Sequence, residues 1–316
     1  MAFCKNCGTD VGSASFCANC GTKVEESVAT RQVNVQVNNL KDNPNIVCTD
    51  SMGCFEIYEY QRDMSVNPAM ATVAYYMNEM NYRKRQVLCT LNGSAIKMQA
   101  GAMQWSAGAV TMDADVKGAK DFFGKAIKSV TTGESLSKPI YSGTGYVMLE
   151  PTYKYILFED VSEWGSGIVL DDGMFLACDA SVQEEMVKRS NISSAILGGE
   201  GLFNLSLSGN GIVALESSVP REELIEIVLD NDEVRIDGNM AVAWSKSLEF
   251  TVEKSTKSLL GSFVSGEGVV NVYRGTGKIL MAPVAPGTLM SSANQPSEEG
   301  KTSSAGLVGS IANSLF

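Results

Sequence analysis

The chain has 316 residues, enough for one large domain or two ordinary ones, and its 44% hydrophobic and 19% charged residues are typical of a globular protein. Its formal net charge is −11 and it contains no His. The acidic balance disfavours general binding to nucleic-acid phosphates, and the lack of imidazole removes the commonest general base. Neither a long apolar run nor an apolar leader is found, which predicts a cytoplasmic protein without a transmembrane helix.

Two C-x-x-C pairs open the chain inside nearly identical octets, FCKNCGTD and FCANCGTK. This spacing supplies four thiolates in the tetrahedral arrangement that structural Zn²⁺ prefers, and so small a module depends on its metal for folding. We therefore predict a zinc ribbon in residues 1–24, with Zn²⁺ held by Cys4, Cys7, Cys17 and Cys20. A redox pair or disulfide is the alternative, but no βαβ pattern flanks the motif. With four protein ligands no position stays open for catalysis, so we expect the ribbon to bind a protein partner.

Three further segments lie outside the predicted sheets. Residues 25–50 are polar and predict a linker, and residues 286–316 predict a flexible C-terminal tail. Asn67 followed by Pro68 predicts the start of a helix. One face of that helix would carry Met70, Val73, Met77 and Met80. Core packing is the favoured interpretation of this face, and a methionine-lined groove for a partner is the alternative.

An internal repeat dominates residues 51–285. Its clearest marks are the G-x-G pairs that begin at Gly143, Gly209 and Gly275, each 66 residues after the last. A second shared element precedes each pair, at 96–108, 168–180 and 234–246. Short alternating runs around Gly turns indicate antiparallel hairpins. The sequence therefore predicts a mainly β fold, an antiparallel β sandwich or prism in which three similar units pack around a pseudo-threefold axis.

A family resemblance rests on glycine-rich motifs: AGAM (100–103), TGESL (132–136), GGEGL (198–202), SGNG (208–211) and DGNMAVAW (237–244). These resemble the altered inheritance of mitochondria protein 24 family over residues 85–285. The resemblance implies a β fold like that of the tryptophan RNA-binding attenuation protein, a homo-oligomer, and no agreed biochemical activity. Basic and aromatic positions do not repeat across the three copies, so RNA binding is not carried over.

Repeated carboxylates are the candidates for a ligand or ion site. Glu134, Glu200 and Glu267 each follow a Gly at the same place in the three copies. A threefold arrangement would bring them around a cation, but the favoured interpretation is structural, with each Glu accepting N–H bonds from its own turn. Neither an S-x-x-K nor a G-x-S-x-G motif is present, and we expect no enzymatic activity.

Two basic segments complete the survey. Arg83, Lys84 and Arg85 are interpreted as a solvated strand edge that discourages pairing with other chains. A helical insert is predicted at 116–130, where Phe122 and Phe123 are flanked by Lys117, Lys120, Lys125 and Lys128. Packing on the body is favoured for this insert, and peripheral contact with an anionic membrane is the alternative.

Together these features predict a non-catalytic cytoplasmic β-scaffold that self-associates and recruits a protein partner through its zinc ribbon. The alternatives are a nucleic-acid-binding regulatory protein and a protein that binds a small ligand or ion. The net charge of −11 disfavours the first of these alternatives.

Overall fold

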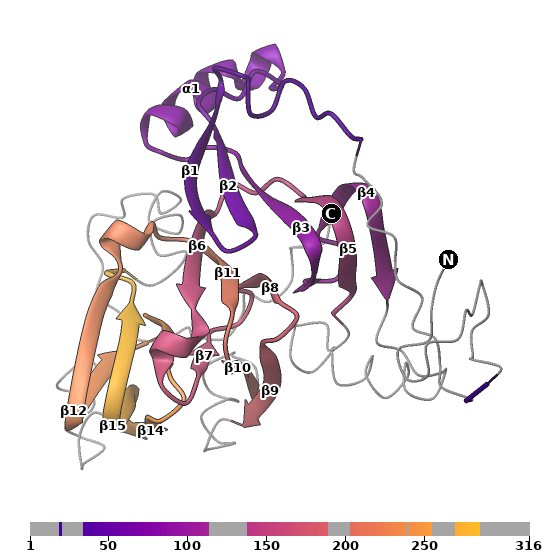
Figure 1. Ribbon diagram of the computed structural model, residues 1–316. Coiled ribbons are helices and arrows are strands. Elements are labelled where there is room, and N and C mark those ends of the chain that lie inside the picture. Colours follow the sequence, from indigo (N-terminus) through magenta and orange to yellow (C-terminus); the bar gives the residue numbers. More distant parts are fainter. Residues whose placement is uncertain are drawn as a thin grey trace, which may run out of the picture.

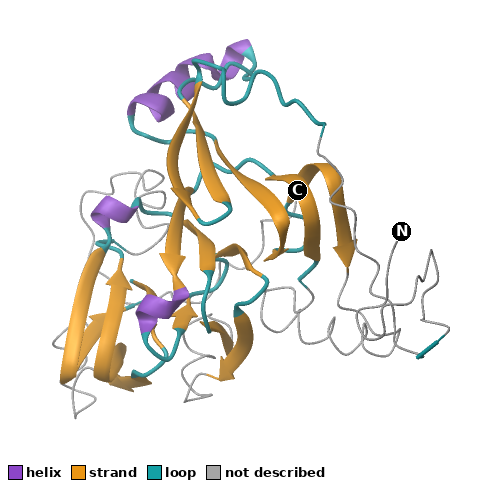
Figure 2. Cartoon of the chain, viewed as in Figure 1, coloured by secondary structure: helices purple, strands orange, loops and turns teal. Residues whose placement is uncertain are grey.

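The computed structural model describes residues 19–20, 34–113, 138–188, 203–238, 240–254 and 269–284. Within these residues the fold is mainly β, with fifteen strands, one α-helix and three 3-10 helices (Figure 2). All strand pairs among them are antiparallel. The prediction of a mainly β, antiparallel fold is confirmed.

The strands form two curled sheets. Among the described residues the first sheet has eight strands in the order β1-β2-β3-β8-β11-β6, and β5 pairs with both β3 and β4. These strands are β1 (Ile46–Met52), β2 (Phe55–Tyr60), β3 (Arg85–Met98), β4 (Met103–Asp113), β5 (Ile140–Leu149), β6 (Tyr155–Asp160), β8 (Phe175–Asp179) and β11 (Ile212–Ser217). β1 therefore begins inside the 25–50 segment for which a linker was predicted.

The second sheet has seven strands in the described part of the chain, in the order β12-β15-β13-β7-β10-β9, with β14 added to β15. They are β7 (Ile168–Leu170), β9 (Gln183–Lys188), β10 (Phe203–Ser208), β12 (Ile225–Asp237), β13 (Ala241–Ser245), β14 (Glu249–Lys254) and β15 (Val269–Met281). Figure 1 shows β12 and β15 at one end of the molecule, with β4 and β5 at the other.

The helices are short. α1 (Ala71–Glu79) follows a 3-10 helix at Pro68–Met70 and lies beyond the ends of β1 and β2 (Figure 1). Two more 3-10 helices, Val161–Trp164 and Arg221–Glu223, precede β7 and β12.

The main hydrophobic core is shared by the two sheets. Trp164 is 2% exposed and belongs to one buried cluster with Leu157 and Leu215 from the first sheet and Leu170 and Leu205 from the second. Full burial of a leucine or aromatic side chain contributes about 1.5–3 kcal/mol, so this cluster holds the sheets together. Further buried clusters lie within each sheet.

Close approach between neighbouring strands explains the G-x-G motif. A Cβ on Gly143, whose φ is +128°, would lie 2.0 Å from the carbonyl oxygen of Ala109 on β4. A Cβ on Gly145 would lie 2.1 Å from the carbonyl oxygen of Ala107. Because no side chain fits at either distance, only glycine lets β5 pair with β4 in this way.

The three regions that share the repeat also share their pairing register. In each of them one residue is skipped between two successive pairs, which is the mark of a β-bulge. The pairs are Met103–Leu149 and Trp105–Met148 in β4/β5, Phe175–Leu215 and Ala177–Ala214 in β8/β11, and Ala241–Met281 and Ala243–Leu280 in β13/β15. Corresponding residues of the sequence repeat therefore occupy corresponding places in the hydrogen-bonded ladders.

The middle region differs from the other two in one respect. β5 and β15 each run unbroken through their G-x-G pair, whereas the corresponding middle segment stops at Ser208 and resumes at Ile212. β10, before this break, belongs to the second sheet, and β11, after it, belongs to the first. The middle region is thus divided between the two sheets.

Candidate functional site

Most residues predicted to form sites lie outside the described part of the chain. This holds for Cys4, Cys7 and Cys17, and for all three repeated carboxylates, Glu134, Glu200 and Glu267. Cys20 is described and lies exposed in a turn. Among the described residues no group of three or more His, Cys, Asp or Glu side chains is placed to hold a metal ion. The zinc site and the three-glutamate site therefore stay predictions.

One surface feature of the described residues is built around α1. Its start follows the sequence prediction: the Asn67 side chain accepts a hydrogen bond from the Met70 amide at 3.1 Å, and Pro68 occupies the first turn. The helix ends at Glu79 with Met80 as its C-cap, and Asn81 then takes a left-handed conformation with φ of 64°. Asn67 thus caps the 3-10 turn from which α1 continues.

The prediction that α1 packs its methionine face into the core is wrong. No residue of the helix is buried. Met70 and Val73 are each 47% exposed and Met80 is 70% exposed. Tyr75 and Tyr76, on the rest of the helix, are 62% and 63% exposed. Such a gathering of exposed apolar side chains is typical of a binding surface.

A groove of about 410 Å³ runs beside α1. Its apolar wall is formed by Val66, Met70, Val73, Ala74, Met77 and Tyr82. Polar groups line the rest of it, mainly Asp63, Arg83, Lys84 and Tyr153. A second hollow of about 400 Å³ shares Ala74 and extends to Tyr75 and Glu79. The helix is therefore flanked by open space, and we call the first hollow the α1 groove.

Asp63 anchors the polar side of the α1 groove. It accepts hydrogen bonds from the Ser65 amide at 3.1 Å and from the Tyr153 hydroxyl, and it lies 3.2 Å from Lys84 Nζ. Burial raises the pKa of Asp63, but these donors outweigh burial and hold the pKa below its usual value. The hydrogen bond to Asp63, together with burial, raises the pKa of Tyr153 to about 12. Both groups keep one charge state near neutral pH, which suits binding rather than proton transfer.

Two basic residues beneath the groove form ion pairs with one buried glutamate. Glu59 accepts from Arg83 at 2.8 Å and from Arg85 at 2.7 Å, and Arg85 also donates to the Asn81 carbonyl at 3.0 Å. Arg85 is only 4% exposed. The interpretation of 83–85 as a solvated strand edge is therefore wrong, because these side chains tie the end of α1 to β2. No local motif marks Glu59, Asp63 or Tyr153, which meet their partners only in the folded chain.

The cysteines of the body have little nucleophilic character. Burial raises the pKa of Cys54 and of Cys178 to about 12 and that of Cys89 well above its usual value. The thiolate is the reactive form of cysteine, so these groups stay unreactive thiols at neutral pH.

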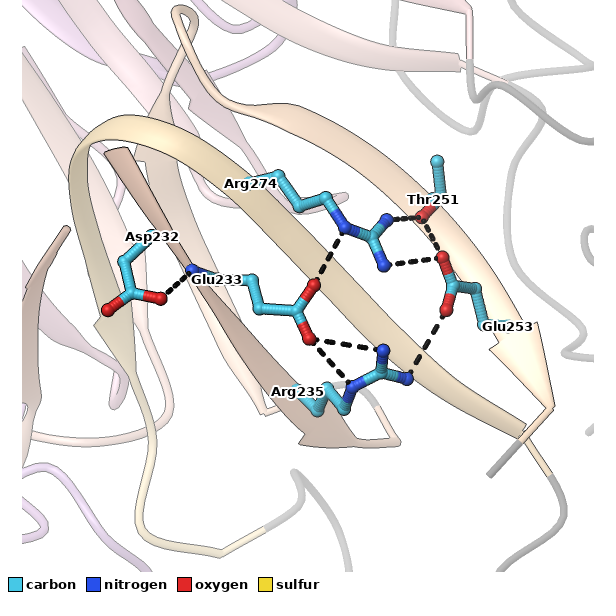
Figure 3. A network of polar contacts seen from close by, with 6 residues as sticks. All are labelled: Asp232, Glu233, Arg235, Thr251, Glu253 and Arg274. Carbon is cyan, nitrogen blue, oxygen red and sulfur yellow. Dashed lines mark hydrogen bonds and ion pairs between the residues drawn. The ribbon is translucent and has the colours of Figure 1, made fainter. Parts of the chain in front are cut away.

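A second polar cluster lies on β12, β14 and β15 (Figure 3). Glu233 accepts from Arg274 at 2.8 Å and from Arg235 at 3.1 Å, and Glu253 accepts from the same two arginines at 2.7 and 3.2 Å. The hydrogen bond from Arg274 is the largest cause that holds the pKa of Glu253 below its usual value. Two positive and two negative charges cancel here, so the cluster is not an anion-binding patch.

In the described ranges of the chain, no helix is long and apolar enough to cross a bilayer.

Comparison with known proteins finds a matching family model, a similar sequence and a similar solved structure. The family model described as "Mitochondrial biogenesis AIM24" matches residues 79–284. An uncharacterized protein of Streptococcus pyogenes serotype M6 is 32% identical over 196 residues, which cover 60% of this chain and 76% of that protein. A crystal structure of another Streptococcus pyogenes protein gives a TM-score of 0.49 at 27% identity, over 67% of this chain and 94% of that one. Because the family model matches more than half of the chain, the chain belongs to the AIM24 mitochondrial biogenesis family.

Proposed function

We propose that this protein is a non-catalytic β-scaffold of the cytoplasm that binds protein partners at two places and self-associates. The observation that carries the proposal is the exposed face of α1 above a groove of about 410 Å³. Such a surface exposes apolar side chains to water at a cost that a bound partner removes.

The chemistry of the α1 groove favours a protein segment as its occupant. Methionine side chains adapt to apolar partners of varied shape, and the wall contains both Met70 and Met77. The polar side of the groove contains Asp63, Lys84 and Tyr153, which can form hydrogen bonds with a peptide backbone. α1 has no basic residue in its last turn, and Lys84 is paired with Asp63, so little free positive charge is left to attract an anionic lipid surface. We infer that the groove takes an amphipathic helix with two or three apolar side chains.

The predicted zinc ribbon is the second binding place. The spacing of Cys4, Cys7, Cys17 and Cys20 supports a closed Zn²⁺ site, which suits an adaptor surface. Its thiolate ligands need a reducing compartment, and this supports the cytoplasm as the place of action.

We also infer that the body is built from three similar units. Its support is the common register and bulge of β4/β5, β8/β11 and β13/β15. Duplication of one hairpin unit accounts for these shared details, whereas unrelated hairpins would have no reason to repeat the same bulge.

Site-specific photo-cross-linking in cells tests the α1 groove. A photoreactive residue is placed at Val73, which is 47% exposed, and in a control chain at Val47 on β1, which is 43% exposed. We expect a cross-linked protein partner from position 73 and none of that mass from position 47.

Titration of the identified partner completes the test. Val73→Asn should weaken its binding about tenfold, because a polar group replaces a buried apolar contact. Val47→Asn should leave the affinity unchanged, and both variants should keep the melting temperature of the parent. Equal affinities of the two variants for the partner would show that the groove does not bind it. A chain lacking residues 1–24 should keep this partner and lose those held by the ribbon.

A further inference from the structure

Two junctions between neighbouring units are built alike. β3 pairs with β8 through Ile96–Asp179, Lys97–Cys178 and Met98–Ala177. β7 pairs with β13 through Ile168–Ser245, Val169–Trp244 and Leu170–Ala243. The repeat aligns Ile96 with Ile168 and Ala177 with Ala243, so the second junction copies the register of the first.

The backbone bonds that flank these junctions are copied as well. The first junction has bonds from the Gln99 amide to the Leu176 carbonyl at 2.8 Å and from Ala180 to Ala95 at 2.9 Å. The second has bonds from Asp171 to Val242 at 2.9 Å and from Lys246 to Gly167 at 2.8 Å. Each of the four residues in one junction corresponds to one in the other.

Each of the two strand segments that form these junctions has a third counterpart in the repeat. These two counterparts lie at opposite ends of the molecule (Figure 1). Residues 234–236 of β12 correspond to the joining segments of β3 and β7, and residues 105–107 of β4 correspond to those of β8 and β13. Within the described residues β12 pairs only with β15, and β4 only with β5. Each strand thus has one edge that joins no other described strand. Figure 1 shows the two strands far apart, on either side of the intervening sheets.

Side-chain burial differs between the closed junctions and the open edges. In the closed junctions the inward-facing side chains Ile96, Met98, Ala177, Ile168, Leu170 and Ala243 are 0% exposed. At the open edges Ile236 is 3% exposed, but Val234, Trp105 and Ala107 remain partly exposed. Pairing of the open edges would bury Val234 and Trp105 as their counterparts in the closed junctions are buried. Ala107 corresponds to Ser245, which is 3% exposed, and to Asp179, which stays partly exposed.

We propose that β12 of one chain pairs with β4 of a second copy of this chain, antiparallel and in the register of the two internal junctions. The pairs are Val234–Ala107, Arg235–Ser106 and Ile236–Trp105. Flanking bonds run from the Asp237 amide to the Gln104 carbonyl and from the Gly108 amide to the Glu233 carbonyl. This inference specifies the self-association named under the proposed function and rests on it.

A second copy is the occupant because the two edges of one chain lie far apart, on either side of the intervening sheets (Figure 1). The contact joins two different surfaces, so each chain in an assembly has one β12 edge and one β4 edge to offer. Such head-to-tail contacts produce closed rings when the rotation per chain closes and open chains when it does not. Oligomers built in this way would continue the internal repeat from one chain into the next.

Disulfide trapping between two singly substituted full-length chains tests the register. Chain with Arg235→Cys is mixed with chain carrying Ser106→Cys, and the control mixture replaces the latter with Met112→Cys. Arg235, Ser106 and Met112 are all exposed, and Met112 lies six residues further along β4, about 20 Å away. We expect about tenfold more of the linked peptide from the 235–106 mixture than from the 235–112 mixture, read by mass spectrometry after mild oxidation.

Four outcomes would contradict this inference or the wider proposal, and they separate the two. Equal amounts of the two linked peptides would overturn the register. A chain carrying both Arg235→Cys and Ser106→Cys that links only within itself at all concentrations would show that the edges close inside one chain. Light scattering of the parent chain separates the remaining cases: oligomers without the 235–106 link contradict the β12–β4 contact alone, and single chains at every concentration contradict self-association itself.

Discussion

Arg85 and Glu59 form an ion pair whose side chains are only 5% and 9% exposed. Removal of one partner leaves the other charged and buried, which costs about 3–5 kcal/mol. The position of the pair below α1 makes it a support for the α1 groove as well as for the contact between β2 and β3.

We expect Glu59→Ala to lower the free energy of unfolding by about 3 kcal/mol. The matched control is Lys41→Ala, which removes the exposed Lys41–Glu56 pair, with its lysine 55% exposed, and should cost less than about 1 kcal/mol. Urea unfolding at neutral pH measures both. Similar losses for the two variants would mean that Arg85 reaches water in the parent chain.

Glu159 is a second buried acid and is 7% exposed. Whereas removal of the Glu59 charge should destabilise the fold, removal of the Glu159 charge should stabilise it at neutral pH. Burial raises its pKa, although a hydrogen bond from Trp164 Nε1 at 3.1 Å and the nearby Arg221 act against burial. A raised pKa means that the folded state favours the protonated acid, so this contribution is present at low pH and is lost as pH rises through the folded pKa. At neutral pH Glu159 therefore no longer makes its contribution to the stability of the folded chain.

Glu159→Gln should become progressively more stable than the parent as pH increases from about 4 to 7, since glutamine accepts the same Trp164 bond without a charge. Melting temperatures across that pH range give the comparison. Glu163→Gln, a change in an exposed residue of the same 3-10 helix, serves as control and should show a smaller trend. A parent chain that gains stability over Glu159→Gln at pH 7 would contradict the argument.

At the scale of single elements, β5 shows how a glycine is required by its neighbour. Gly143→Ala would place a Cβ 2.0 Å from the Ala109 carbonyl, at a φ of +128°. We expect a loss of about 3 kcal/mol or more, because β4 must move away from β5. Gly93→Ala is the control: its φ is +73° and nothing lies within 4 Å, so it should cost only about 1–2 kcal/mol.

Denaturant unfolding of the two alanine variants separates two causes of lost stability: close contact with a neighbouring strand, and a backbone conformation that alanine disfavours. Both glycines have positive φ, and only Gly143 also meets a neighbouring strand. If the two variants lose the same stability, conformation alone explains the motif and the contact with β4 is unimportant.

Prediction from sequence succeeded where a single residue type had no substitute. The first G-x-G pair marks a place where neighbouring strands approach closely, because the contacts of Gly143 and Gly145 with β4 exclude every side chain. The expectation that these glycines form hairpin turns is wrong, since Gly143 and Gly275 lie inside the unbroken strands β5 and β15. The start of the helix at Asn67 and Pro68 was also readable, because capping is local.

Prediction failed where the outcome depended on what lies opposite an element. The apolar face of α1 has the spacing of a core face, but periodicity does not say whether another element covers it, and in the described residues none buries it. In the same way Arg85 belongs to a basic run in the sequence, yet the distant Glu59 turns it into a buried ion pair. Long-range partners of this kind leave no local pattern.

At the scale of the whole molecule, the predicted ribbon is expected to be independent of the β body. Residues 1–24 contain their own four cysteines, and the buried clusters of the described body are formed by later residues. Elemental analysis should find one zinc per full-length chain, and Cys4→Ser with Cys7→Ser should abolish it.

The β body of that double variant should keep the melting temperature of the parent, because the metal stabilises only the ribbon. The chain without residues 1–24 provides the control. Zinc that remains after both substitutions would contradict the assigned ligands. A large fall in melting temperature in both chains would show that the ribbon supports the sheets.

The division of the middle region between the sheets also bears on synthesis at the ribosome. β6, β8 and β11 complete the first sheet by residue 217, while β7, β9 and β10 belong to a sheet whose last strand ends at Met281. A nascent chain of that intermediate length therefore exposes the edge of β7 that later pairs with β13. Unpaired strand edges attract other chains and chaperones, so the time between emergence of residues 217 and 281 is the period of greatest aggregation risk for this protein.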